Sequence, residues 1–128
     1  MKFDKLIKLL ESGLEDSWTD TINGKQFTVT LPEIIEYLKN TSSINIPTKN
    51  LKNLLVGAVQ TPDQEHKRRI QNADLNYPII VVVKNGKYTM LLDGNHRLQR
   101  AINNNLPTIK AKVLELSKSP KTWQYLFR

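Results

Sequence analysis

The chain has 128 residues, 39% of them hydrophobic and 24% charged, proportions typical of one globular domain and unlike those of disordered chains. It contains no cysteine, which excludes disulfides, thiolate zinc sites and a cysteine nucleophile. The net charge is +7, and the excess lies in the second half, because residues 1–60 carry seven basic and seven acidic side chains whereas residues 61–128 carry twelve and five. This asymmetry favours an anionic partner: nucleotide phosphates, nucleic acid or an acidic protein.

Apolar stretches in the sequence are short. The longest, such as residues 79–83, fall well below the roughly 18 residues that a membrane span requires. The charged start at residues 1–5 also lacks the long apolar segment of a signal peptide. We therefore expect a soluble cytoplasmic protein with no membrane partner.

The first part of the chain predicts a helix, a hairpin and a second helix. Apolar residues recur at helical spacing over residues 3–10, and residues 11–13 supply a stop. Residues 18–30 alternate around Asn23-Gly24, a pair that favours a type I′ hairpin turn. Thr30 and Glu33 have the spacing of a capping box, which predicts a helix that continues to about Asn40.

The middle of the chain contains weaker signals followed by a clearer helix start. A short strand is expected at Ile44–Pro47 and a helical turn at residues 51–55. Thr61-Pro62 favours the start of a helix, since threonine caps and proline suits the first helical position. This helix is expected to end near Ala73, with Asp63 and Glu65 at its positive end.

The strongest structural signal is the β-branched run of residues 77–83, typical of a strand buried on both faces. Asn85-Gly86 then predicts a turn, and residues 87–92 a returning strand with Tyr88, Met90 and Leu92 on one face. These two strands form a hairpin that we expect at the centre of the fold.

The C-terminal part of the chain predicts a helix, a strand and a last helix. Leu98, Ala101 and Ile102 fit one helical face, and the helix is expected to end at the asparagines before Pro107. Residues 108–116 alternate as a strand. Ser119-Pro120 opens a final helix that carries three large apolar side chains, Trp123, Leu126 and Phe127.

The candidate functional site is the turn Asp93-Gly94-Asn95-His96-Arg97, where the buried hairpin passes directly into a helix. Backbone N–H groups in a first helical turn have no acceptor inside the helix and attract anions. Gly94 permits a sharp turn and close approach of a ligand, while Asn95 and His96 can donate hydrogen bonds. Arg97 offers a planar fork for phosphate oxygens, and Arg100 extends the basic rim.

Carboxylates near this turn have several possible roles. Asp93 could cap the amides and hold the turn, or bind a metal that accompanies the phosphates. The alternative without a functional role is that Asp-Gly-Asn only forms the turn, and that His96 and Arg97 lie on a solvated face of the helix. Phosphoryl transfer would need a carboxylate as base or magnesium ligand, for which the sequence offers four candidates without a ranking: Asp93, Glu65, Asp63 and Asp74.

A dense basic run occupies residues 66–69. Lys67, Arg68 and Arg69 could form a solvated helix face or a wall that binds nucleic acid. Glu65 and Arg69 have the i,i+4 spacing of an ion pair. The two histidines lack a spaced set of carboxylate partners, which disfavours a zinc site. No metal ligand can be named from the sequence.

The run of residues 77–101 contains Tyr-Pro-Ile-Ile-Val, a hairpin and Leu-Leu-Asp-Gly-Asn-His-Arg-Leu-Gln-Arg-Ala. It resembles the ParB/sulfiredoxin superfamily, and especially the small free-standing ParB-like proteins of bacteriophages. The resemblance implies an α+β fold, a small mixed sheet with a central hairpin flanked by helices. It implies one domain over residues 1–128, with a core at 44–116, an N-terminal helix and hairpin at 1–40 and a C-terminal helix at 119–128.

The resemblance also implies ATP or another nucleoside triphosphate as ligand, with Mg²⁺, and phosphate contacts by Gly94, Asn95, His96 and Arg97. Asn95 stands where sulfiredoxins have their catalytic cysteine, which excludes sulfinic acid repair. The Gly-Glu-Arg-Arg motif and the helix-turn-helix domain of partition proteins are absent from the sequence, which disfavours partition. We therefore expect a phosphotransferase or NTPase, with Asp93, His96 and Glu65 as the candidate catalytic residues.

Two alternatives remain at this stage. The chain could be a non-catalytic phage module that binds DNA or a host protein in the host cytoplasm, or a ParB-like nuclease.

Overall fold

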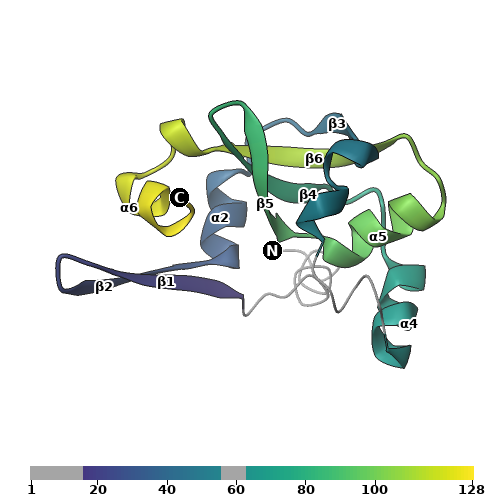
Figure 1. Ribbon diagram of the computed structural model, residues 1–128, viewed down its shortest axis with the longest axis horizontal. Helices are drawn as coiled ribbons and strands as arrows, with labels where there is room; N and C mark the ends of the chain where they lie inside the picture. The colour runs from purple at the N-terminus through teal and green to yellow at the C-terminus, as the bar shows by residue number, and fades with distance from the viewer. Residues whose placement is uncertain (1–15, 56–62) are drawn as a thin grey trace.

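The computed structural model describes residues 16–55 and 63–128 (Figure 1). These residues form a mixed α+β fold that contains two β-sheets and four α-helices. The α+β class predicted from the sequence is confirmed. The helix expected at residues 3–10 and the cap expected at Thr61-Pro62 lie outside the described residues.

The first sheet is the antiparallel hairpin of β1 (Ser17–Ile22) and β2 (Lys25–Thr30). Its turn residues Asn23 and Gly24 both have positive φ, 52° and 80°, as a type I′ turn requires, so the predicted hairpin is confirmed.

Helix α2 (Leu31–Tyr37) begins with the predicted capping box. The Thr30 side chain accepts from the Glu33 N–H, and the Glu33 carboxylate accepts from the Thr30 N–H. The helix is shorter than expected, since it ends at Tyr37 instead of Asn40. The Lys112 ammonium donates to the Leu38 carbonyl at 3.0 Å, which satisfies an acceptor at the helix end.

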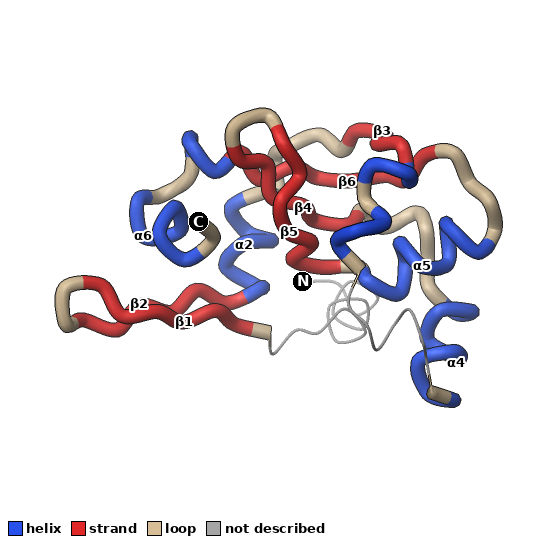
Figure 2. The backbone as a smooth tube through the Cα atoms, viewed as in Figure 1, coloured by secondary structure: helices blue, strands red, loops and turns tan. Residues whose placement is uncertain are grey.

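The second sheet has the strand order β3-β6-β4-β5 (Figure 2). Its members are β3 (Ile44–Pro47), β6 (Thr108–Glu115), β4 (Ile79–Lys84) and β5 (Lys87–Asp93). The outer pairs are antiparallel and the inner pair of β6 and β4 is parallel, so the sheet is mixed, as predicted. The β4–β5 hairpin is not wholly central, because β5 lies at the sheet edge.

The two faces of this sheet pack against different elements. Ile80 and Val82 of β4 face a core built with β2, α2 and the C-terminal helix α6 (Lys121–Leu126). Ile79 and Val81 face a second core, built with β3, the helix α5 (Asn95–Asn103) and Leu51. All four β4 residues are at most 4% exposed, which confirms the predicted strand buried on both faces.

The prediction that Tyr88, Met90 and Leu92 share one face of β5 is wrong. Val82 pairs with Met90 and Val83 pairs with Tyr88, so Thr89 is an extra residue on β5. Such a bulge shifts the alternation of side chains by one position. As a result Met90 and Leu92 belong to the core under α2, whereas Tyr88 packs on the opposite face.

Helix α4 (Gln64–Asn72) lies at the edge of the molecule beside α5 (Figure 1). Asp63 is its N-cap and accepts from the His66 N–H at 2.9 Å. The helix ends one residue before the expected Ala73. Residues expected to form a helical turn near Leu51 form two short 3-10 turns, Thr48–Asn50 and Lys52–Leu54.

Candidate functional site

The candidate turn joins β5 to α5 through one residue, Gly94. Its φ of 104° lies in the left-handed region, which lets the chain leave the strand at Asp93 and enter the helix at Asn95. A Cβ on Gly94 would lie 2.4 Å from Cγ2 and 2.9 Å from Cβ of Ile79. The glycine is therefore needed for close packing of the turn on β4, and not only for the ligand approach that the sequence suggested.

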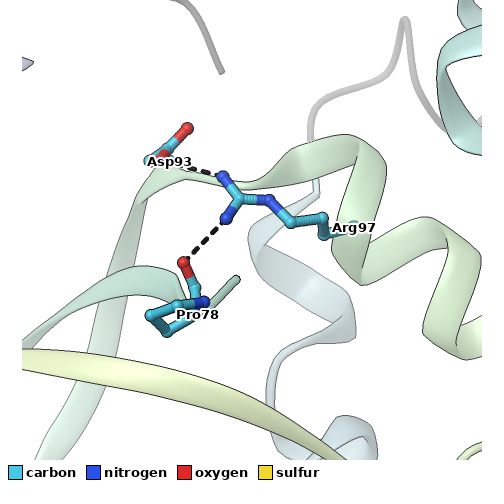
Figure 3. Close-up of polar contacts among 3 residues, drawn as sticks. All are labelled: Pro78, Asp93 and Arg97. Carbon is cyan, nitrogen blue, oxygen red and sulfur yellow. Dashed lines mark hydrogen bonds and ion pairs between the residues drawn. The ribbon is translucent and has the colours of Figure 1, made fainter. Parts of the chain in front are cut away.

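The Arg97 guanidinium lies in a buried contact beneath the turn (Figure 3). One of its terminal nitrogens donates to Asp93 Oδ2 at 2.8 Å, and the other donates to the Pro78 carbonyl at 2.8 Å. The two charged side chains are only 9% and 6% exposed. Arg97 therefore links the end of β5, the start of β4 and the first turn of α5, an internal role that the sequence-based interpretation did not assign to it.

The second carboxylate oxygen of Asp93 has a different environment. Asp93 Oδ1 is buried and has no hydrogen-bond partner among the described residues, and Figure 3 shows it directed away from Arg97. Burial raises the pKa of this carboxyl above its usual value of 3.8, although the Arg97 charge, the Arg97 hydrogen bond and, least, a hydrogen bond from the Gly94 backbone oppose the shift. Asp16 adds a smaller upward contribution to the same pKa. A carboxylate of this kind accepts a proton or a hydrogen bond more readily than an exposed one.

The N-terminus of α5 has no side-chain cap, since its N-cap residue is Gly94. The first intrahelical backbone bond runs from the Leu98 N–H to the Gly94 carbonyl at 2.9 Å. The positive end of the helix dipole therefore lies at Asn95 and His96, at the position where anions bind to helices.

His96 contacts His66 of the neighbouring helix. Their rings are stacked with centroids 5.1 Å apart and planes 13° apart, and His66 Nδ1 lies 2.8 Å from His96 Nε2. Since one nitrogen must donate and the other accept, this contact needs at least one neutral ring. The pair joins α4 to the candidate turn, and His66 is a site residue that sequence reasoning did not select, because 30 positions separate it from His96.

The environment of His96 is positively charged. Burial is the largest cause that lowers its pKa, and together with the neighbouring charges of Arg69, His66 and Arg97 it brings the pKa from 6.5 to about 4. The ring is therefore neutral near pH 7. The cations that disfavour imidazolium here would favour a bound anion.

This depressed pKa predicts a pH dependence of stability. The unfolded chain binds a proton at this histidine near pH 6.5, whereas the folded chain does so only near pH 4. The contribution of His96 to the free energy of unfolding is thus largest above pH 6.5 and falls as the pH drops towards 4. This contribution to the free energy of unfolding falls by at most about 3 kcal/mol. The fall is smaller than that because the ring is partly exposed and water screens its charge.

Urea unfolding of wild type and His96→Gln at several pH values measures this effect. We expect the stability difference between the two proteins to change between pH 6.5 and 4 and to be constant above pH 7. A difference that does not vary with pH would contradict the depressed pKa.

The remaining candidate residues lie around this turn or on α4. Arg69 is half-buried on the side of α4 that faces His96, and Arg100 is half-buried one turn along α5. Glu65, Lys67 and Arg68 are exposed. Glu65 makes no ion pair with another described residue, so the expected pairing with Arg69 is not formed.

The four candidate carboxylates differ in their contacts and in their burial. Asp63 is engaged as the N-cap of α4, and Asp74 accepts from the Asn76 N–H at 3.0 Å. Glu65 is exposed on α4, whereas Asp93 is buried directly beside the turn. Of the four, Asp93 is thus the carboxylate whose pKa is raised and whose Oδ1 has no hydrogen-bond partner within the described residues.

Over residues 16–55 and 63–128, no three histidine or acidic side chains come together as a metal site. In the same ranges, no helix is long and apolar enough to cross a membrane.

The chain has no match among protein-family models, curated proteins or solved structures. Its resemblance to the ParB/sulfiredoxin superfamily therefore stays a prediction that rests on the residues quoted above.

Proposed function

We propose that this protein binds a nucleoside triphosphate, with its phosphates at the start of α5. The observation that carries the proposal is the cationic, half-buried environment of His96 at the positive end of that helix, where the N-cap residue is Gly94. Arg69 and Arg97 both contribute positive potential there. A phosphate would gain from the helix dipole and from these charges together.

In this proposal the residues of the turn have distinct roles. His96 and Asn95 contact the phosphates, and Arg69 and Arg100 supply charge from α4 and α5. Arg97 acts as a positioning residue, since its guanidinium already binds Asp93 and Pro78. Gly94 holds the turn close to β4. The direct phosphate contact by Arg97 that the family resemblance implies would require its buried pair to open.

We further propose that the protein is a phosphotransferase or NTPase. Catalysis of phosphoryl transfer depends on positioning and on charge neutralisation, with a carboxylate that orients the nucleophile or holds Mg²⁺. Asp93 is the best placed carboxylate for either role, because it is adjacent to the turn and its Oδ1 has no partner within the described residues. Glu65 is the second candidate, on the exposed flank of α4. This assignment is consistent with a ParB/sulfiredoxin-like fold in the cytoplasm.

A charge substitution at the helix start tests the proposal. His96→Glu places a carboxylate at the proposed phosphate position, where it is compatible with the positive helix end. We expect calorimetric titration with ATP, CTP and GTP, with and without Mg²⁺, to detect binding to wild type and none to His96→Glu. Gln99→Glu is the matched control, since it makes the same charge change further along α5 and should keep most of the affinity.

Nucleotide turnover in wild type, Asp93→Asn and Glu65→Gln then tests catalysis. If all three proteins bind the nucleotide and none of them turns it over, the result would support a binding module instead of an enzyme. The absence of binding by wild type, or equal binding by wild type and His96→Glu, would refute the phosphate site.

A further inference from the structure

The contact between His66 and His96 is a hydrogen bond with a defined direction. His66 Nδ1 and His96 Nε2 are 2.8 Å apart, the ring centroids are 5.1 Å apart and the ring planes differ by 13°. This centroid separation is close to the largest that the nitrogen–nitrogen distance allows, so both nitrogens lie near the line that joins the two rings. Because an imidazole N–H points directly away from its ring, the hydrogen bond is nearly linear.

The position of His66 is set by helix α4 and not by the candidate turn. Asp63 Oδ1 accepts the backbone N–H of His66 at 2.9 Å, which holds the first turn of α4. Ile70 lies one turn further along the same side of the helix and is buried. Helix α5 is the element against which α4 packs most closely. His66 therefore contacts His96 from a separate, docked helix.

The hydrogen bond determines which nitrogen of His96 carries a hydrogen. His96 is neutral near pH 7, since its pKa is lowered to about 4, and a neutral imidazole has one N–H and one bare nitrogen. If His66 Nδ1–H donates, His96 Nε2 accepts and His96 Nδ1 carries the hydrogen. If His96 Nε2–H donates instead, its Nδ1 is bare and can only accept. The first arrangement alone gives the neutral ring a donor for a phosphate oxygen.

We propose that His66 is a positioning residue of the phosphate site: its Nδ1–H donates to His96 Nε2 and leaves the Nδ1–H of His96 for the phosphates. This inference rests on the proposed function, with phosphates at the start of α5. Among the described residues, no other side chain forms a hydrogen bond with the His96 ring. His66 Nδ1 carries a hydrogen in the protonated ring and in one neutral tautomer, so this role does not require a particular charge on His66.

The nitrogen-15 NMR signals of the imidazole rings in the ligand-free protein test the proposed tautomer, because bare and hydrogen-bearing nitrogens have well separated chemical shifts. Near pH 7 we expect the hydrogen of His96 on Nδ1 in wild type. His66→Phe keeps an aromatic ring but has no nitrogen, so the hydrogen should move to Nε2, the form usual for unconstrained histidine. His66→Asn should keep the wild-type pattern, because its amide nitrogen can donate from nearly the position of Nδ1.

Calorimetric titration with ATP relates this tautomer to binding. We expect His66→Phe to bind ATP about tenfold or more weakly than wild type, as for the loss of a hydrogen bond to a charged group. His66→Asn should recover most of the affinity, which a role in helix packing alone would not explain. Gln71→Ala, an exposed substitution on α4, is the control and should match wild type in both measurements. Circular dichroism checks that each variant is folded.

Two results would overturn the role of His66: the hydrogen of His96 on Nε2 in ligand-free wild type, or equal ATP affinity of wild type and His66→Phe. The absence of ATP binding by wild type would refute the phosphate site, and the role of His66 with it. Because the NMR measurement needs no nucleotide, a failure of the His66 hydrogen bond and a failure of the proposed function are distinguishable.

Discussion

Gly94→Ala is expected to lower the free energy of unfolding by about 3 kcal/mol or more, from two independent costs. The first is the φ of 104°, which a residue with a Cβ adopts only under strain. The second is the clash of the new Cβ with Ile79, which includes its Cβ at 2.9 Å and its Cα at 3.2 Å. Because these atoms belong to the backbone or adjoin it, rotation of the Ile79 side chain cannot remove the overlap.

Gly86→Ala is the matched control for this substitution. Gly86 also has positive φ, 74°, but a Cβ there would meet no atom within 4 Å. Gly86→Ala should therefore lower the free energy of unfolding only by the cost of placing a residue with a Cβ at positive φ, about 1 kcal/mol. Chemical denaturation of the three proteins measures both effects, and equal losses at Gly94 and Gly86 would show that the turn is not packed tightly on β4.

Arg97→Ala is expected to destabilise the protein by about 3–5 kcal/mol, the cost of removing one partner from a buried ion pair. The substitution leaves the Asp93 carboxylate buried without its cation and the Pro78 carbonyl without its donor. It should also raise the Asp93 pKa further, because the Arg97 charge now opposes the upward shift. The variant should consequently recover part of its lost stability as the pH falls from 7 and Asp93 becomes protonated.

The double variant Asp93→Asn/Arg97→Met removes both charges and should be more stable than Arg97→Ala, since no buried charge is then left unpaired. Lys39→Ala removes one partner of an exposed pair with Glu36, in which the side chains are 54% and 70% exposed, and should change stability by less than about 1 kcal/mol. An Arg97→Ala effect as small as that of Lys39→Ala would contradict the burial and pairing described here.

Local chemistry made much of the fold predictable. Asn23-Gly24 and Asn85-Gly86 form the hairpin turns expected of them, with positive φ at all four residues. Thr30 and Glu33 form the expected capping box. These features depend on residues within four positions of one another, so they can be predicted from the sequence alone. The Asp93–Arg97 pair has the same property, since its i,i+4 spacing could have suggested an internal contact.

Features that depend on distant pairing could not be predicted in this way. The β3-β6-β4-β5 order joins strands far apart in the chain, and the bulge at Thr89 that redirects Tyr88 is set by the pairing of β5 with β4. The contact of His66 with His96 depends on how α4 packs on α5. Periodicity within one strand or helix contains no information about these placements.

The titration of His96, followed by the NMR signals of its imidazole with and without saturating ATP, tests the phosphate site most directly. A bound polyphosphate would place negative charge beside the ring and favour its protonated form. We predict that the pKa of His96 rises clearly above its unliganded value of about 4 when ATP is present. An unchanged titration curve at ATP concentrations that saturate the protein would contradict phosphate binding at the start of α5.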